Sequence, residues 1–292
     1  MVRLGIIYKS LLEDDFKVLC ALEKALVSRE YAPLRLLEKT SKLHEGKLSL
    51  IMAKLHDLNL VKRETISGEK MYRLTYLGYD MLALRALVKD NIVEAIGSKI
   101  GVGKESEIYS GLAPNGIEIA IKFLRIGRTS FRQTARVRRW GAERGISWYT
   151  QSKLAAEREF KALRELQPFN VYTPKPIGYS RHVVVVEFID GLELFERPPL
   201  SDPDGVLNGV LNTIGIAYHK ASIVHGDLSE YNILIRKEDE KPFIIDWPQY
   251  VYSDDPNAID LLERDIKYIV KFFNKVYKVA LDPKEALKRI IG

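Results

Sequence analysis

The sequence predicts an α+β protein with two domains, a mainly helical one over residues 1–90 and a larger mixed one over residues 91–292. Three observations lead to this prediction. The chain has 292 residues, which suits two domains of roughly 150 residues each. Apolar residues recur at helical spacing through most of the first 90 residues. From residue 95 onward, short apolar runs alternate with glycine-containing turns, a pattern typical of strands.

The composition excludes a largely disordered chain and argues against a membrane-spanning one. Hydrophobic residues make up 46% of the chain and charged residues 29%, as in ordinary globular proteins. The longest aliphatic run is Val183–Val186, far below the ~20 residues that span a bilayer. Residues 1–12 show no secretory signal. The single cysteine, Cys20, excludes an internal disulfide and a cysteine-based zinc site. We expect a cytoplasmic protein with no membrane or disulfide partner.

The first domain is expected to contain three helices and then a hairpin. Helical spacing marks a helix within residues 16–27, a short one after Pro33, and a third over about residues 45–58. Residues 60–64 and 70–75 then predict two strands around a Ser-Gly turn, with a closing helix at residues 77–88. This order of elements resembles the winged-helix family.

The resemblance implies that the third helix faces a nucleic-acid groove. Basic residues on and near it could contact phosphates: Lys42, Lys47, Lys54, Lys62 and Arg63. Winged helices also serve as protein-docking modules, so the sequence leaves RNA, DNA and protein open as partners.

Positive charge is concentrated in two parts of the chain. The net charge is +6, and residues 1–90 hold 16 basic and 12 acidic residues. Residues 125–140 contain six arginines and no acidic residue. Because buried, uncompensated cations are costly, we expect the segment from Arg125 to Arg144 to be an exposed loop. It would meet phosphate or remain a solvated run of charge.

The second domain is expected to open with three strands. Its first turn contains Gly101, Gly103, Lys104 and Ser106, and an apolar strand at residues 119–123 carries Lys122. The glycines fit neither a Rossmann motif, since no helix follows them, nor the spacing of a Walker A loop. Taken alone, they indicate no more than a structural turn.

Further along, acidic and amide residues follow in a fixed order. A helix over residues 156–166 carries Glu157 and Glu159. After the apolar strand at residues 183–189 come two polar sequences, His225-Gly-Asp227-Leu-Ser-Glu-Tyr-Asn232 and Asp246-Trp-Pro. A phosphoryl-transfer site needs a cation for the phosphates, oxygen ligands for a metal, and an acid that orients the acceptor. These residues supply all three.

In this order the residues resemble protein kinases and, more narrowly, the RIO2 group of the RIO family. The RIO-like motifs are Gly101-x-Gly103-Lys104-Glu-Ser106, His225-Gly-Asp227-Leu-Ser-x-Tyr-Asn232 and Ile245-Asp246-Trp-Pro-Gln249. The winged helix in front distinguishes the RIO2 group. The resemblance implies a truncated, two-lobed kinase-like domain, with the N-lobe over about residues 91–187 and the C-lobe over about 188–292.

The resemblance also implies ATP with Mg²⁺ or Mn²⁺, and a role for each site residue. Lys122 would hold the phosphates and pair with Glu159, with Glu157 as the alternative. Asp227 would be the general base or position the acceptor. Asp246 would bind the metal and could itself accept the phosphoryl group, giving an ATPase cycle. The remaining contacts would be Gly101, Gly103, Lys104 and Ser106 to phosphate, Asn232 with Asp246 to the metal, and the backbone of Glu187 and Ile189 to adenine.

Several neighbouring residues are expected to support the site rather than to react. His225 would orient the loop, and His219 would end the preceding helix. Glu263, Arg264 and Asp265 would brace the catalytic loop. The sequence does not decide between loop anchoring and simple packing for Trp140 and Trp148.

The family implies an atypical serine/threonine kinase or ATPase that matures the small ribosomal subunit. Basic segments suit an rRNA-containing partner, because phosphate neutralisation gives affinity without reading sequence. Two alternatives stay open: a small-molecule phosphotransferase, and a non-catalytic nucleic-acid-binding regulator with a kinase-like fold. The run of arginines does not suit a cationic small substrate, and no catalytic position is missing.

Overall fold

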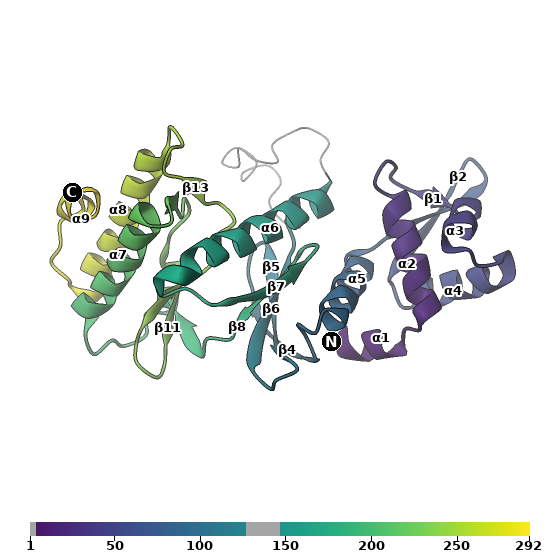
Figure 1. Ribbon diagram of the computed structural model, residues 1–292, viewed down its shortest axis with the longest axis horizontal. Helices are drawn as coiled ribbons and strands as arrows, with labels where there is room; N and C mark the ends of the chain where they lie inside the picture. Colours follow the sequence, from purple (N-terminus) through teal and green to yellow (C-terminus); the bar gives the residue numbers. More distant parts are fainter. Residues whose placement is uncertain (1–3, 127–146) are drawn as a thin grey trace. The chain divides into compact units, whose positions relative to one another are not determined.

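The computed structural model describes residues 4–126 and 147–292. The chain divides into two compact units (Figure 1). The first comprises Met1–Ser98 with Gly111–Ile117, and the second comprises Lys99–Ser110 with Glu118–Gly292. Within the described residues, no helix combines the length and the apolar character that crossing a membrane requires.

The first unit contains the expected helices and hairpin. Its sheet has the order β1-β3-β2, and both pairings are antiparallel. Ser67 and Gly68 both have positive φ angles, 51° and 81°, which is the backbone that a tight two-residue hairpin turn requires. Helix α1 and strand β1 were not expected from the sequence. The elements are α1 (Leu4–Ser10), α2 (Glu13–Ala25), β1 (Ala32–Pro33), α3 (Leu34–Ser41), α4 (Glu45–Asp57), β2 (Val61–Ile66), β3 (Glu69–Leu74) and α5 (Tyr76–Lys89).

The core of the first unit follows from the spacing of its apolar side chains. Leu48, Met52 and Leu55 are buried along one face of α4, as a period of 3.6 residues requires. Helix α5 begins at Thr75, whose hydroxyl accepts a hydrogen bond from Gly78 N at 3.1 Å. A Cβ on Gly78 would lie 2.3 Å from Leu60 O, so only glycine allows this helix to approach the preceding strand.

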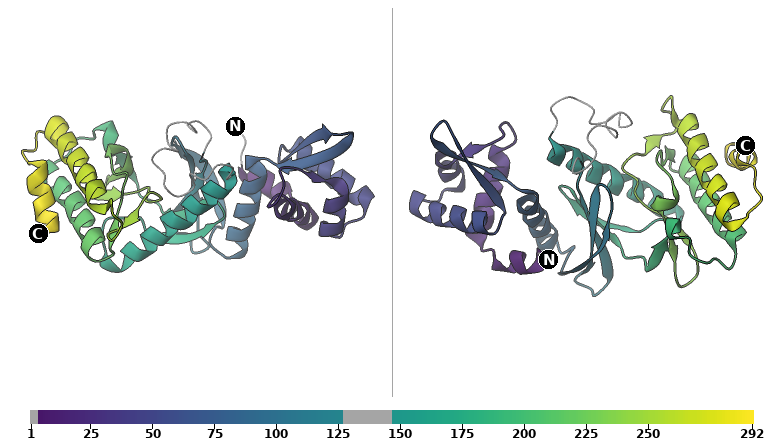
Figure 2. Two further views of the ribbon diagram at one scale, coloured as in Figure 1. Left: turned by 90° about the horizontal axis from the view of Figure 1, so that it is seen from above. Right: turned by 180° about the vertical axis from the view of Figure 1, so that it is seen from behind.

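The second unit begins with most of a five-stranded sheet of order β4-β5-β6-β8-β7, of which residues 95–98 in β4 and 111–112 in β5 belong to the first unit. Strands β6 and β8 are antiparallel, with Lys122 opposite Val184. Helix α6 packs along strands β6, β8 and β7, as Figures 1 and 2 show. It begins at Trp148, well before the expected start, because Ser147 caps its first turn by accepting from Thr150 N at 3.2 Å. The elements are β4 (Ala95–Val102), β5 (Ser106–Leu112), β6 (Glu118–Leu124), α6 (Trp148–Leu166), β7 (Pro176–Ser180) and β8 (Val183–Glu187).

The rest of the second unit is mainly helical and carries the polar loops. Two small antiparallel sheets, β12-β11-β9 and β10-β13, lie beside helices α7, α8 and α9. His219 is the last residue of α7, as expected. Only residues 247–257 separate Asp246 from α8, a connection too short for a long activation segment. The elements are β9 (Gly191–Glu193), α7 (Pro203–His219), β10 (Ile223–Val224), β11 (Ile233–Arg236), β12 (Pro242–Ile244), β13 (Val251–Tyr252), α8 (Ala258–Tyr277) and α9 (Pro283–Ile291), with 3₁₀ turns η2 (Gln167–Phe169), η3 (Leu194–Glu196) and η4 (Glu230–Asn232).

Candidate active site

Lys122, Glu159 and Asp246 meet at the centre of the second unit. Lys122 Nζ lies 2.8 and 3.0 Å from the two carboxylate oxygens of Glu159 and 2.8 Å from Asp246 Oδ1. Side chains alternate along a strand, so Ile121 and Phe123 are buried on one face of β6 while Lys122 reaches the other. Three elements, β6, α6 and the segment after β12, therefore contribute one charged group each.

The structure joins Lys122 to Glu159 and not to Glu157. Glu159 lies on the buried face of α6 with Ala155, Ala156 and Leu163, whereas Glu157 is exposed. The two glutamates are two residues apart, which places them on different sides of a helix. The register of α6 thus makes Glu159, and not Glu157, the partner of Lys122.

The charges in this cluster are unequally accessible. The side chains of Lys122 and Glu159 are 12% and 5% exposed, whereas that of Asp246 is 41% exposed. Burial alone would lower the pKa of Lys122, but the carboxylates of Asp246 and Glu159 outweigh burial and raise it above its usual range. Lys122 is therefore a fixed cation. It contacts the buried carboxylate of Glu159 and the more accessible carboxylate of Asp246.

Asp246 has an unusual backbone conformation. Its φ angle is +67°, in the left-handed region that costs a non-glycine residue about 1–3 kcal/mol and recurs at functional sites. The flanking residues hold this conformation. The Ile245 N–H donates to Asn232 O at 2.9 Å, and the almost fully buried Trp247 donates from Nε1 to Ile244 O at 3.1 Å. The conformation of Asp246 is thus fixed from both sides, by the hydrogen bond from Ile245 N to Asn232 O and by the buried side chain of Trp247.

Arg158 on α6 also fixes the segment after Asp246. Its Nε donates to Pro248 O at 2.8 Å, and its Nη2 donates to Tyr250 O. The guanidinium lies 4.5 Å from the centre of the Tyr250 ring, a cation–π contact. The sequence analysis did not identify Arg158, although it immediately precedes Glu159.

The loop that carries Asp227 requires a glycine at position 226. Gly226 has a φ angle of +77°, and a Cβ there would lie 3.0 Å from Gln249 O. Asp227 is exposed at the end of this turn. Asn232 Nδ2 donates to Asp227 O at 2.8 Å, so the loop closes on itself and keeps both polar residues together.

His225 lies in the core beneath this loop. Its Nε2 lies 3.0 Å from Ile245 O, and its Nδ1 accepts from Asp227 N at 3.3 Å. Because a carbonyl oxygen can only accept, the proton is on Nε2 and the ring is neutral. Burial lowers the pKa of His225 to about 4. His225 therefore orients the loop, as expected, and stays uncharged at neutral pH.

Two residues of α8 brace the same loop, as the sequence predicted. Asp265 accepts from Gly226 N at 2.8 Å and from Leu228 N at 3.3 Å. Arg264 Nη2 donates to Gly226 O. Burial raises the pKa of Asp265 to about 6, even though Arg264 and both backbone bonds favour the charged form. Glu263 was expected to brace the loop as well, but among the described residues its side chain forms no hydrogen bond or salt bridge with the loop.

The glycine-rich turn joins β4 to β5. Gly103 N donates to Ser106 O at 2.9 Å, and a Cβ on Gly103 would lie 3.0 Å from Ser106 Oγ. A Cβ on Gly101 would only touch Ile108 at 3.5 Å, an ordinary contact. Lys104 is exposed at the tip. The turn is thus tight at Gly103, whereas at Gly101 the structure has room for a side chain.

Arg125 is buried and paired, contrary to the prediction that it begins an exposed basic loop. It donates to Glu107 Oε2 from Nε at 3.2 Å and from Nη2 at 3.1 Å, and its N–H donates to Glu105 O at 2.6 Å. The pairing was missed because Glu107 lies on a neighbouring strand. The other arginines of residues 125–140 (Arg128, Arg132, Arg136, Arg138 and Arg139) and Trp140 lie outside the described residues.

The network around Arg125 lies beneath the glycine-rich turn. Glu107 also accepts from Lys99 Nζ at 2.6 Å, and Arg125 Nη1 lies 3.1 Å from Nε2 of the buried His182. The His182 ring contacts Trp148 edge-on, with ring centres 6.3 Å apart. Trp148 is therefore an anchor at the start of α6.

The backbone expected to meet adenine lies at the end of β8 and just after it. Glu187 N already donates to Lys175 O at 2.9 Å, which leaves its carbonyl as the group for that contact. Within the described residues, the N–H of Ile189 donates to no backbone carbonyl. The two positions thus offer one acceptor and one donor, the pair that an adenine edge needs.

The donor set fits a magnesium ion better than a metal held by protein alone. The described residues contain no group of three or more His, Cys, Asp and Glu side chains arranged to hold a metal. The side chains of Asn232 and Asp246 contain oxygen atoms of the kind that Mg²⁺ prefers, and the Ile245 N–H, next to Asp246, donates to Asn232 O. Mg²⁺ is commonly held by one or two protein oxygens together with substrate phosphates.

Comparison with known protein families gives two matches. The RIO domain family matches residues 107–286, and the family of Rio2 N-terminal domains matches residues 8–90. Together they cover most of the chain.

Known proteins with similar sequences are named as RIO kinases, of the Rio2 group and the Rio1 group. A Methanocaldococcus jannaschii protein, RIO-type serine/threonine-protein kinase Rio2, is 37% identical over 256 residues, covering 86% of this chain and 92% of the relative. The Schizosaccharomyces pombe serine/threonine-protein kinase rio2 is 34% identical, covering 95% and 81%. The Caenorhabditis elegans serine/threonine-protein kinase RIO2 is 36% identical, and the chain spans about half of its length, 52%.

A solved structure shares the fold. The crystal structure of the Rio2 kinase–ADP/Mg²⁺–phosphoaspartate complex from Chaetomium thermophilum matches with a TM-score of 0.82 and 32% identity. The match covers 98% of this chain and 88% of the other. This agreement extends over both units.

Proposed function

The chain belongs to the RIO family of kinases, with a Rio2-type N-terminal domain before its RIO domain, and on this basis we propose that it is an atypical ATP-dependent serine/threonine kinase or ATPase. The observation that carries the proposal is the contact of Lys122 with both Glu159 and Asp246 at 2.8 Å. A fixed cation between a buried and an accessible carboxylate is the arrangement that phosphoryl transfer uses.

Each side chain has a defined part in nucleotide binding. Lys122 neutralises the nucleotide phosphates, and Glu159 fixes its position. The glycine-rich turn offers backbone N–H groups and the Ser106 hydroxyl as further donors to the phosphates. Glu187 O and Ile189 N select the adenine edge. Asn232 and Asp246 would hold Mg²⁺, which when bound draws charge from the transferring phosphate.

Asp246 is proposed as the group that receives the phosphoryl. Its carboxylate is accessible and contacts Lys122, the cation proposed to neutralise the phosphates. An Asp246 oxygen attacks the γ-phosphorus, the bond to the β–γ bridging oxygen breaks, and ADP leaves. Water then hydrolyses the acyl phosphate to inorganic phosphate, which restores the carboxylate. The Rio2 kinase complex from Chaetomium thermophilum contains ADP, Mg²⁺ and a phosphoaspartate.

Asp227 would act on the acceptor. It is exposed one turn from Asn232, where it can orient or deprotonate a water or a hydroxyl group. The residues between Asp246 and α8 are too few to bind a peptide as an activation segment does. A protein acceptor would therefore be held by other surfaces.

The proposed partner is the maturing small ribosomal subunit, through its rRNA, in the cytoplasm. The net charge of +6 supports an anionic partner of this kind. The basic run over residues 125–140 would add phosphate contacts.

Measurement of ATP hydrolysis with and without Mg²⁺ tests the catalytic proposal. We expect metal-dependent release of phosphate, lost in Asp246→Asn and reduced by about 100-fold or more in Lys122→Met. Lys237→Met serves as a control, because Lys237 is an exposed lysine that pairs with Asp190. Full turnover in Asp246→Asn would remove Asp246 from the mechanism.

A further inference from the structure

A basic groove in the first unit has no part in the proposed catalytic site. It lies between α2, the end of α3 and α5, with a volume of about 280 Å³. Its lining includes four cationic side chains and a single carboxylate, Glu13. The cations are Lys17, Lys24, Arg85 and Lys89.

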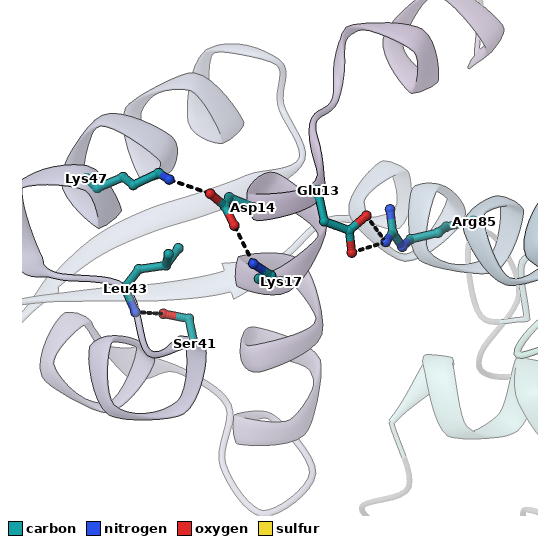
Figure 3. Close-up of polar contacts among 7 residues, drawn as sticks. All are labelled: Glu13, Asp14, Lys17, Ser41, Leu43, Lys47 and Arg85. Atoms are coloured by element: carbon teal, nitrogen blue, oxygen red, sulfur yellow. Dashed lines mark hydrogen bonds and ion pairs between the residues drawn. The ribbon is translucent and has the colours of Figure 1, made fainter.

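Two of these cations are held by acidic neighbours. Arg85 forms an ion pair with Glu13, and its guanidinium lies 4.2 Å from the centre of the Phe16 ring. Lys17 Nζ lies 2.7 Å from Asp14 Oδ1. Figure 3 shows both pairs, one on each side of the start of α2.

The other two cations have no such partner. Lys24 and Lys89 are exposed and form no salt bridge with any described residue. Thr40 and Ser41 also line the groove. Ser41 Oγ accepts from Leu43 N at 3.4 Å, so its O–H can still donate. Two lysines and a donor hydroxyl make this part of the groove suited to a phosphate group.

Helix α4, by contrast, which the sequence predicted would face a nucleic-acid groove, offers less positive charge than its sequence suggested. Lys47 pairs with Asp14, and Lys54 pairs with Asp15 while also donating to Ser10 O. Figure 3 shows Asp14 lying between Lys47 and Lys17. Two of the five basic residues expected to meet phosphate through α4 are therefore neutralised by α2.

We propose that the groove between α2, α3 and α5 binds the backbone phosphates of single-stranded RNA, with Lys24 and Lys89 as its principal contacts. The inference rests on the RNA-containing partner of the proposed function. Lys24 lies in the last turn of α2 and Lys89 in the last turn of α5, so two separate helices each contribute one of these cations. Two separate cations in one groove suit successive phosphates of one strand, rather than the single charge of a small anion.

Binding of a fluorescein-labelled twelve-nucleotide oligouridylate to the whole chain tests this proposal. We expect Lys24→Gln/Lys89→Gln to weaken binding roughly 20-fold at 0.1 M salt and to reduce the slope of log affinity against log salt by about 1.4, since each single-strand phosphate contact contributes about 0.7. The matched control is Lys267→Gln/Lys271→Gln, which removes the same charge from two exposed positions one turn apart on α8 in the second unit.

The outcomes separate the groove from general charge. A loss confined to the Lys24/Lys89 variant, with unchanged thermal unfolding, supports the groove. An equal loss in both variants, or none in either, overturns it. Equal competition by polyglutamate at the same charge would show a non-selective anion surface and would also overturn it. If the wild-type chain binds no RNA while ATP hydrolysis persists, the groove and the rRNA partner fail and the catalytic proposal stands.

Discussion

At the scale of single residues, the site depends on charges that cannot be removed one at a time. Lys122 is nearly buried between Glu159 and Asp246. Removing the lysine leaves Glu159 as a buried charge without its cation, which is more costly than removing both members of the pair.

Replacement of Lys122 by methionine should lower the free energy of unfolding by about 3 kcal/mol. Replacing both Lys122 and Glu159 by methionine should cost less than Lys122→Met alone, because no buried charge then remains. Urea unfolding of the two variants checks this order. A double variant less stable than Lys122→Met would contradict the assignment of Glu159 as the buried partner.

The neutral His225 predicts a pH dependence of stability. Its pKa is about 4 in the folded chain and about 6.5 unfolded, so the unfolded state binds more protons between these values. Stability therefore falls as pH drops from 6.5 to 4, by about 3 kcal/mol from this residue. Asp265, with its pKa raised to about 6, acts in the opposite direction because the folded state holds more protons there.

The two contributions are separated by comparing variants. Unfolding of wild type and His225→Gln at pH 7 and pH 4.5 should show a smaller loss of stability on acidification in the variant. His56→Gln, exposed on α4, should behave as wild type. A variant that loses as much stability as wild type would show that His225 does not titrate in the core.

At the scale of elements, the turns around Asp227 and Asp246 set the positions of the reactive groups. Asp246 and Gly226 both have positive φ angles, and each is held by a neighbouring segment. Gly226 lies against Gln249 O, and Asp265 fixes its N–H. The catalytic loop is therefore positioned by backbone geometry that only particular residues can adopt.

Gly226→Ala should destabilise the chain more than Gly116→Ala. Both glycines have a φ angle of +77°, but a Cβ on Gly116 would meet nothing within 4 Å, whereas one on Gly226 would lie 3.0 Å from Gln249 O. The Gly116 variant measures the conformational cost alone, about 1 kcal/mol. Equal thermal shifts in the two variants would show that the contact with Gln249 is unimportant.

The elements also show what the sequence could and could not predict. Periodicity predicted α2 to α5 and the hairpin of the first unit but not α1 or β1. The order of motifs singled out Lys122 and Asp246, which the structure brings into contact, and Asp227 and Asn232, which share one loop. The pairing of Arg125 with Glu107 could not be predicted, because it depends on which strands become neighbours. The neutralisation of Lys47 and Lys54 by α2 depends in the same way on tertiary packing.

At the scale of the whole molecule, a basic winged-helix unit and a RIO-type catalytic unit share one chain with a net charge of +6. In the proposal, the charge brings the protein to an RNA-containing particle, and the catalytic unit turns over ATP there. The account depends most on Asp246, the accessible carboxylate beside Lys122.

The most direct measurement is incubation of the pure chain with Mg²⁺ and γ-labelled ATP, followed by hydroxylamine treatment of the acid-quenched protein. The account predicts label that survives acid, leaves with hydroxylamine and is absent in Asp246→Asn. Asp227→Asn should still form the label and release it more slowly. Label that resists hydroxylamine, or that persists in Asp246→Asn, would contradict the account and place the phosphoryl group elsewhere.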